Sequence, residues 1–126
     1  MPLIPDLPWQ ADAVGGSPGV VVLTQLHLRR FRDVPAFLRD SLAIRKQAMR
    51  SPGARSLFLR ARPLARHFTT VSWWDDPAAM AAFVRTDPHR SAMRRWGPEM
   101  RAFSNRSFPG TAGVVPTVAE AEAQPA

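Results

Sequence analysis

The stretch from Thr69 to Trp96, TTVSWWDDPAAMAAFVRTDPHRSAMRRW, decides the fold of this chain. It opens with a β-rich run that ends in paired tryptophans. Two Asp-Pro pairs follow, at positions 76–77 and 87–88, and each places a capping side chain before a proline, as is typical of a helix start. A strand and two short helices are therefore predicted, with His89 in the first turn of the second helix.

The flanking residues complete an α+β pattern. Residues 20–28 and 54–62 alternate as strands do, residues 102–108 fit a further strand, and Asp33 caps a predicted helix with Pro35 in its first turn. The order βαββααβ is a ferredoxin-like βαββαβ unit whose second helix is divided in two. It predicts a four-stranded antiparallel sheet with the helices on one face.

The other face of that sheet has no predicted helix to cover it. In residues 67–74 either alternating set of side chains is too apolar to remain in water. An open apolar sheet face is usually buried against a second copy of itself. We therefore expect a homodimer, built as a dimeric α+β barrel.

Length and local composition predict one folded domain with irregular ends. The chain has 126 residues and 13 prolines. We expect an irregular arm rich in proline and glycine over residues 1–18, a folded body over 19–108, and a disordered tail over 109–126.

Composition excludes several classes of site. The absence of cysteine excludes disulfides and thiolate chemistry. No apolar run reaches the roughly 18 residues of a membrane span and no signal peptide is evident, so we expect a cytoplasmic protein. The net charge of +7 comes from scattered arginines, which fits an anionic ligand or an acidic partner better than nucleic acid. Three histidines without a nearby acidic partner argue against a metal site.

Residues 71–96, VSWWDDPAAMAAFVRTDPHRSAMRRW, resemble a strand-Trp-acid-helix-His signature of the dimeric α+β barrel superfamily. It is similar to that of antibiotic-biosynthesis-monooxygenase-like and spheroidene-monooxygenase-like small proteins. The resemblance implies an oxidoreductase, a monooxygenase acting on a hydrophobic aromatic or polyene metabolite of secondary metabolism. It further implies either no cofactor or haem.

The resemblance also suggests roles for individual residues. Trp74 matches the strand-end tryptophan of the family, while Thr70 and Met80 stand where polyketide-oxidising members have an asparagine and a tyrosine. Arg94 or Arg95 falls near the helix arginine of those members. His89 matches a histidine of the spheroidene-monooxygenase-like group, in which haem is used.

The candidate site combines these matches with the residue pattern. The expected catalytic residues are His89, Trp74, Thr70 and Arg94, and the expected substrate-binding residues are Trp73, Ser72, Phe83, Met80, Trp96 and Arg95. For His89 three interpretations stay open: a general base, a haem ligand, or a packed residue bonded to the backbone. Two alternatives to an enzyme also stay open, namely a non-catalytic haem- or small-ligand-binding dimer and an accessory partner of a biosynthetic enzyme.

Overall fold

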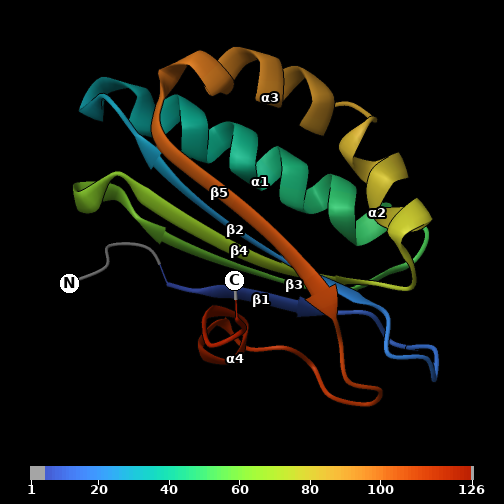
Figure 1. Cartoon of the computed structure of the whole chain (residues 1–126). Helices are drawn as coiled ribbons and strands as arrows, with labels where there is room; N and C mark the ends of the chain where they lie inside the picture. Colours follow the sequence, from blue (N-terminus) through green and yellow to red (C-terminus); the bar gives the residue numbers. More distant parts are fainter. Residues whose placement is uncertain (1–4, 126) are drawn as a thin grey trace.

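One antiparallel sheet of five strands carries three helices on one face and a fourth on the other (Figure 1). The computed structural model describes residues 5–125 of the chain. The strand order is β1-β3-β4-β2-β5. In sequence, the elements are β1 (Leu7–Gln10), β2 (Val20–Leu28), α1 (Val34–Arg50), β3 (Ala54–Arg62), β4 (His67–Trp74), α2 (Pro77–Val84), α3 (His89–Trp96), β5 (Met100–Pro109) and α4 (Val118–Glu122).

The ferredoxin-like α+β prediction is confirmed for the central part of the chain. Strands β2, β3, β4 and β5 and the helices between them follow the βαββαβ order, with α2 and α3 as the divided second helix. Helices α1, α2 and α3 all lie on one face of the sheet (Figure 1). Among the described residues no helix has both the length and the apolarity that crossing a membrane requires.

The sheet has five strands, so the prediction of four was wrong. The fifth is β1, which lies in the segment expected to be an irregular arm and pairs with β3, Trp9 opposite Leu57. A proline such as Pro8 is tolerated here because β1 is an edge strand, which has one side without a hydrogen-bonding neighbour. Trp9 packs against the cluster that contains Leu57 and Trp74, which fixes the arm to the body.

The segment expected to be a disordered tail contains helix α4. Thr117 caps this helix by accepting a hydrogen bond from the backbone N–H of Glu120. Val118 and Ala121 are buried against Val21 and Trp73, on the sheet face opposite α1, α2 and α3 (Figure 1). The chain therefore covers part of the sheet face that the sequence analysis expected to be bare.

Alternation along β4 assigns its side chains to the two faces. The even-numbered residues, including Thr70 and Trp74, point toward α1, α2 and α3, whereas Val71 and Trp73 point toward α4. Trp73 and Trp74 are both 1% exposed, so each belongs to a separate part of the core. The paired tryptophans thus face opposite sides of the sheet, as strand alternation requires.

Candidate functional site

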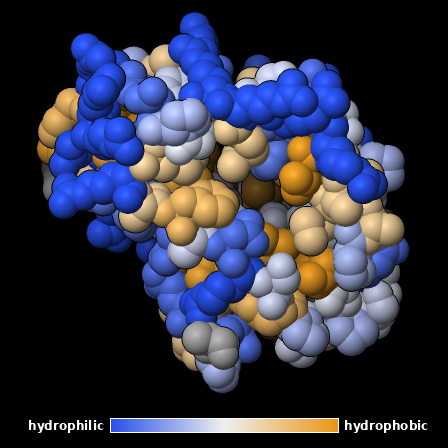
Figure 2. Space-filling view, turned by 45° about the horizontal axis from the view of Figure 1, so that its top comes forward, coloured by the Kyte–Doolittle hydropathy of each residue, from blue (hydrophilic) through white to orange (hydrophobic). Residues whose placement is uncertain are grey.

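A cavity of about 280 Å³ lies between the sheet and helices α1, α2 and α3. Figure 2 shows a hollow on this side of the molecule, with hydrophobic atoms within and around it. The cavity lies near the lower end of the range of roughly 300–1,000 Å³ that is usual for small-molecule sites. Its lining is mainly apolar, and includes Val22, Leu26, Phe37, Ile44, Leu57, Leu59, Phe68, Trp74, Met80, Phe83, Met93, Trp96 and Phe103.

A row of polar side chains crosses the floor of this cavity. In the sheet register Thr24 lies opposite both Thr70 on β4 and Asn105 on β5. Asn105 Nδ2 donates to Thr24 Oγ1 at 3.2 Å. Ser72 lies two residues beyond Thr70 on the same face of β4. A ligand in the cavity thus meets hydrogen-bonding groups on the sheet side and mostly apolar groups elsewhere.

His89 lies at the opposite wall of the cavity, where α3 begins. Its Nδ1 is 3.1 Å from the carbonyl oxygen of Val84. Because a carbonyl can only accept, this hydrogen bond requires the proton on Nδ1, which leaves the lone pair on Nε2 in the neutral ring. Within residues 5–125 no hydrogen bond reaches Nε2. Burial lowers the pKa of the His89 imidazole, against a smaller opposing effect of the Val84 carbonyl, so the neutral form is favoured at pH 7.

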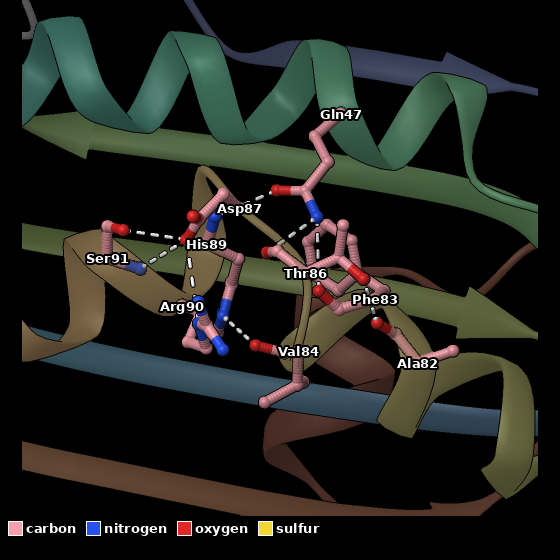
Figure 3. Close-up of polar contacts among 9 residues, drawn as sticks. All are labelled: Gln47, Ala82, Phe83, Val84, Thr86, Asp87, His89, Arg90 and Ser91. Atoms are coloured by element: carbon pink, nitrogen blue, oxygen red, sulfur yellow. Dashed lines mark hydrogen bonds and ion pairs between the residues drawn. The ribbon is translucent and has the colours of Figure 1, made fainter.

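Gln47 on α1 joins the end of α2 to the start of α3 (Figure 3). Its Nε2 donates to the carbonyl oxygens of Phe83 at 3.1 Å and Thr86 at 3.0 Å. Its Oε1 accepts from the backbone N–H of His89 at 2.9 Å. One side-chain amide therefore uses both donor hydrogens and its acceptor on three backbone groups around the histidine.

Three aromatic rings stand in sequence along the cavity wall. The Phe83 ring lies 4.9 Å from the Trp74 ring and 4.9 Å from the His89 ring, between their centroids. Trp74 Nε1 is buried and has no hydrogen-bond partner in the described part of the chain. An unpaired buried donor costs about 1–3 kcal/mol, so the fold retains an unsatisfied polar group beside the cavity.

The structure gathers seven of the predicted site residues around this cavity. They are His89, Trp74, Thr70, Ser72, Phe83, Met80 and Trp96. Three predicted residues, Trp73, Arg94 and Arg95, do not line this cavity. Trp73 faces α4, and its Nε1 donates to the Pro18 carbonyl at 2.8 Å.

The two predicted arginines lie outside the lining of the cavity. Arg94 is exposed on α3. Arg95 pairs with Asp40 at 3.3 Å and stacks on the outer side of the Trp96 ring, 4.6 Å from its centroid. The helix arginines therefore do not meet a ligand held between the helices and the sheet.

Several residues that shape the cavity carry no clear signal in the sequence. Asp40 accepts a hydrogen bond from Trp96 Nε1 at 2.8 Å and thereby fixes that ring between α1 and α3. Asn105 and Gln47 likewise act on residues far away in the sequence. The alternation of β5 could have placed Asn105 on the cavity face, whereas no local pattern marks Gln47.

Comparisons with known proteins agree with this architecture. No protein-family model and no curated protein matches the sequence. Solved structures do match: a protein from Nitrosomonas europaea classed with the antibiotic biosynthesis monooxygenases superposes with a TM-score of 0.66 at 13% identity. That match covers 78% of this chain and 95% of the other. The chain has the ferredoxin-like fold of antibiotic biosynthesis monooxygenase-like proteins.

Two further structures with this fold illustrate its range. A protein from Caulobacter crescentus, also classed with the antibiotic biosynthesis monooxygenases, matches at a TM-score of 0.64 and 16% identity, over 76% of this chain and 92% of its own. A haem-degrading enzyme from Listeria monocytogenes matches at a TM-score of 0.61 and 20% identity, over 81% of this chain and 67% of its own. The resemblance drawn from residues 71–96 is thus confirmed at the level of the fold, while the reaction is decided by the site.

Proposed function

We propose that the protein is a small monooxygenase-like enzyme that oxidises a hydrophobic aromatic or polyene metabolite inside the cavity. The observation that carries this proposal is His89, a neutral imidazole with its Nε2 lone pair free, in the wall of a mainly apolar cavity. Such a group can remove a proton from a bound substrate near pH 7. The fold shared with antibiotic biosynthesis monooxygenase-like proteins supports the same class.

The remaining residues suit the binding of a flat, largely apolar molecule. Trp74 and Phe83 offer ring surfaces for stacking. Thr70 and Ser72 offer hydrogen bonds to a carbonyl or hydroxyl oxygen on one edge of the substrate. Arg94 and Arg95 have no part in this proposal, because they do not line the cavity.

The proposed reaction needs only the substrate and molecular oxygen. His89 removes a proton from a CH₂ group that a neighbouring carbonyl makes acidic, and the resulting carbanion gives its electrons to O₂. One oxygen atom becomes the new carbonyl and the other leaves as water, so R₂CH₂ + O₂ gives R₂C=O + H₂O. The substrate supplies both the hydrogens and the electrons.

The residues present fit haem poorly. A cavity of about 280 Å³ is small for a macrocycle, and Arg45 is the one arginine among its described lining residues. The guanidinium of Arg45 already donates to the Pro8 carbonyl at 3.2 Å and to Met49 Sδ at 3.4 Å, so it is poorly placed to hold two propionates. We therefore propose the reaction without haem.

A non-catalytic ligand-binding protein is the second candidate. It is favoured because, within the described residues, no carboxylate hydrogen-bonds the His89 ring, which bonds a backbone carbonyl instead. Such a protein would bind the same kind of molecule without consuming oxygen. A measurement of turnover therefore distinguishes the enzyme from the binding protein.

We also propose that the chain forms a homodimer through the sheet face that carries α4. Beyond α4 this face presents His27 and His67, whose ring centroids are 6.4 Å apart, and the half-buried Phe58. A stable interface buries about 800 Å² on each partner, so α4 itself would belong to the contact. Sedimentation at micromolar concentration should give twice the 14.0 kDa of the chain, and a monomer would exclude the dimer.

Oxygen consumption with anthrone, a flat aromatic ketone with one acidic CH₂ group, tests the enzymatic proposal. The wild-type protein should consume oxygen faster than the protein-free solution. His89→Gln should lower turnover by about 10²–10⁴-fold, as the loss of a general base does. His67→Gln is the matched control, since His67 lies on the opposite face of the sheet. Equal turnover in the wild type and His89→Gln would refute the role of His89.

A further inference from the structure

We propose that Gln47 is a positioning residue that fixes the His89 ring, with Nε2 free, in the cavity wall. This inference rests on the proposed function of His89. The sequence offers no hint of such a role, because the partners of Gln47 lie 36 to 42 residues away. Figure 3 shows the side chain reaching from α1 to the segment that joins α2 and α3.

The first argument is that Gln47 controls both ends of the hydrogen bond that orients the ring. Val84, which supplies the accepting carbonyl, lies between Phe83 and Thr86, and Gln47 Nε2 holds the carbonyl oxygens of both. His89, which supplies the donating ring, has its backbone N–H held by Gln47 Oε1. Gln47 therefore holds the backbone on both sides of the bond between Nδ1 and the Val84 oxygen.

The second argument is that α2 is held less firmly than α1 and α3, although Ala79, Met80 and Phe83 pack against the core around Trp74. None of its residues is fully buried, and its residues face the cavity only through Met80, Phe83 and Val84. The backbone around Gln47 is well packed, because the next residue on α1, Ala48, lies in the core and is 1% exposed. The amide therefore ties a weakly packed helix to a well-packed one.

The third argument is chemical. The carbonyl oxygens of Phe83 and Thr86 each accept a backbone N–H as well, from Thr86 and Arg90, so the amide adds a second donor to each. The N–H of His89 has only Gln47 Oε1 as its partner among the described residues. A carboxylate of the same shape would face two carbonyl oxygens without a hydrogen to donate, and a methionine of similar length would leave the His89 N–H unpaired.

The test is to follow the ring nitrogens of His89 by ¹⁵N NMR across a pH titration in the full-length protein. The variants are Gln47→Met, which removes all three bonds, and Gln47→Asn, whose amide is one methylene too short to reach them. In both, the Nδ1–H tautomer of His89 should lose its excess, because the ring is no longer held on the Val84 carbonyl, and the loss of that bond should lower the His89 pKa further while the ring stays buried. If Gln47→Met does not fold, Gln47→Asn carries the test.

Gln25→Met is the matched control. Gln25 also donates its amide to a distant partner, Glu122 at 2.8 Å, but it does so on the opposite face of the sheet. This variant should leave the His89 titration unchanged. It therefore separates the loss of a particular amide from the general effect of losing one glutamine bond.

Turnover provides the second measurement. With anthrone as substrate, kcat should fall at least tenfold in both Gln47 variants while KM stays within a factor of about two, because displacement of a catalytic group by about 1 Å costs up to 10²-fold. A lower melting temperature with unchanged His89 tautomer, pKa and kcat would overturn the inference and leave Gln47 a purely structural residue. If the titration shifts as expected while His89→Gln retains full turnover, the positioning holds and the proposed function fails.

Discussion

The same substitution should barely change stability at one of the paired tryptophans and lower it clearly at the other. For Trp74→Phe we expect the free energy of unfolding to stay within about 1 kcal/mol of the wild type. The smaller ring leaves a void, which costs about 1–2 kcal/mol, well below the 3–5 kcal/mol of a change to alanine. The substitution also removes the unpaired buried N–H of Trp74, which relieves about 1–3 kcal/mol. The two effects nearly cancel.

Trp73→Phe is the matched comparison, because both tryptophans are 1% exposed. The Trp73 N–H donates to the Pro18 carbonyl at 2.8 Å, and the Arg55 guanidinium lies 4.9 Å from its ring centroid. The substitution therefore loses packing, leaves a carbonyl without its donor and weakens a cation–π contact. We expect a loss of about 2–5 kcal/mol.

Urea unfolding of the three proteins measures this difference. A loss of 1 kcal/mol corresponds to several degrees in melting temperature for a domain of this size, so the contrast is well within reach. Titration with anthrone, followed by the quenching of tryptophan fluorescence, adds a functional measurement in which only Trp74→Phe should change the affinity. Equal destabilisation by the two substitutions would refute the claim that the Trp74 N–H is unpaired in the folded protein. Weaker binding caused by Trp73→Phe would refute the location of the site.

Two further predictions concern pH and the C-terminal segment. Burial lowers the pKa of His89 below 6.5, so kcat/KM should stay level above pH 6.5 and fall as the pH drops through that lowered pKa. A fall that begins above pH 6.5 would exclude His89 as the base. The stability that this buried neutral ring contributes is present above pH 6.5 and is lost on the same acid side. Deletion of residues 112–126 should lower the free energy of unfolding by about 2–4 kcal/mol in urea, because it removes the buried Val118 and Ala121; an unchanged midpoint would mean that α4 contributes nothing.

Much of the cavity could be predicted from local periodicity. Alternation along residues 67–74 was enough to place Thr70, Ser72 and Trp74 on one face and Trp73 on the other. The helical phase of α3 could also have excluded Arg94 and Arg95. They lie five and six residues after His89, whereas one face of a helix repeats at three or four.

The parts that could not be predicted depend on tertiary contacts. Strand β1 is short and carries Pro8, so it depends on tertiary contacts, namely the pairing with β3 and the packing of Trp9 on the core. Helix α4 has a local signal, the capping pattern of Thr117 and Glu120, but its five residues gain stability only by burial against the sheet. Gln47 gives no signal at all, because a glutamine on a helix reads as a solvent-exposed residue until its partners are known.

The most direct test of the central claim is to locate a bound ligand among the three histidines. Anthrone is titrated under nitrogen, so that no turnover occurs, while the ring signals of His27, His67 and His89 are recorded by ¹⁵N NMR. The cavity between the helices and the sheet contains His89, whereas His27 and His67 lie on the face that carries α4. The account predicts a saturable shift of the His89 ring and none for the other two. A shift confined to His27 and His67, or no shift at any concentration that anthrone reaches in solution, would contradict it.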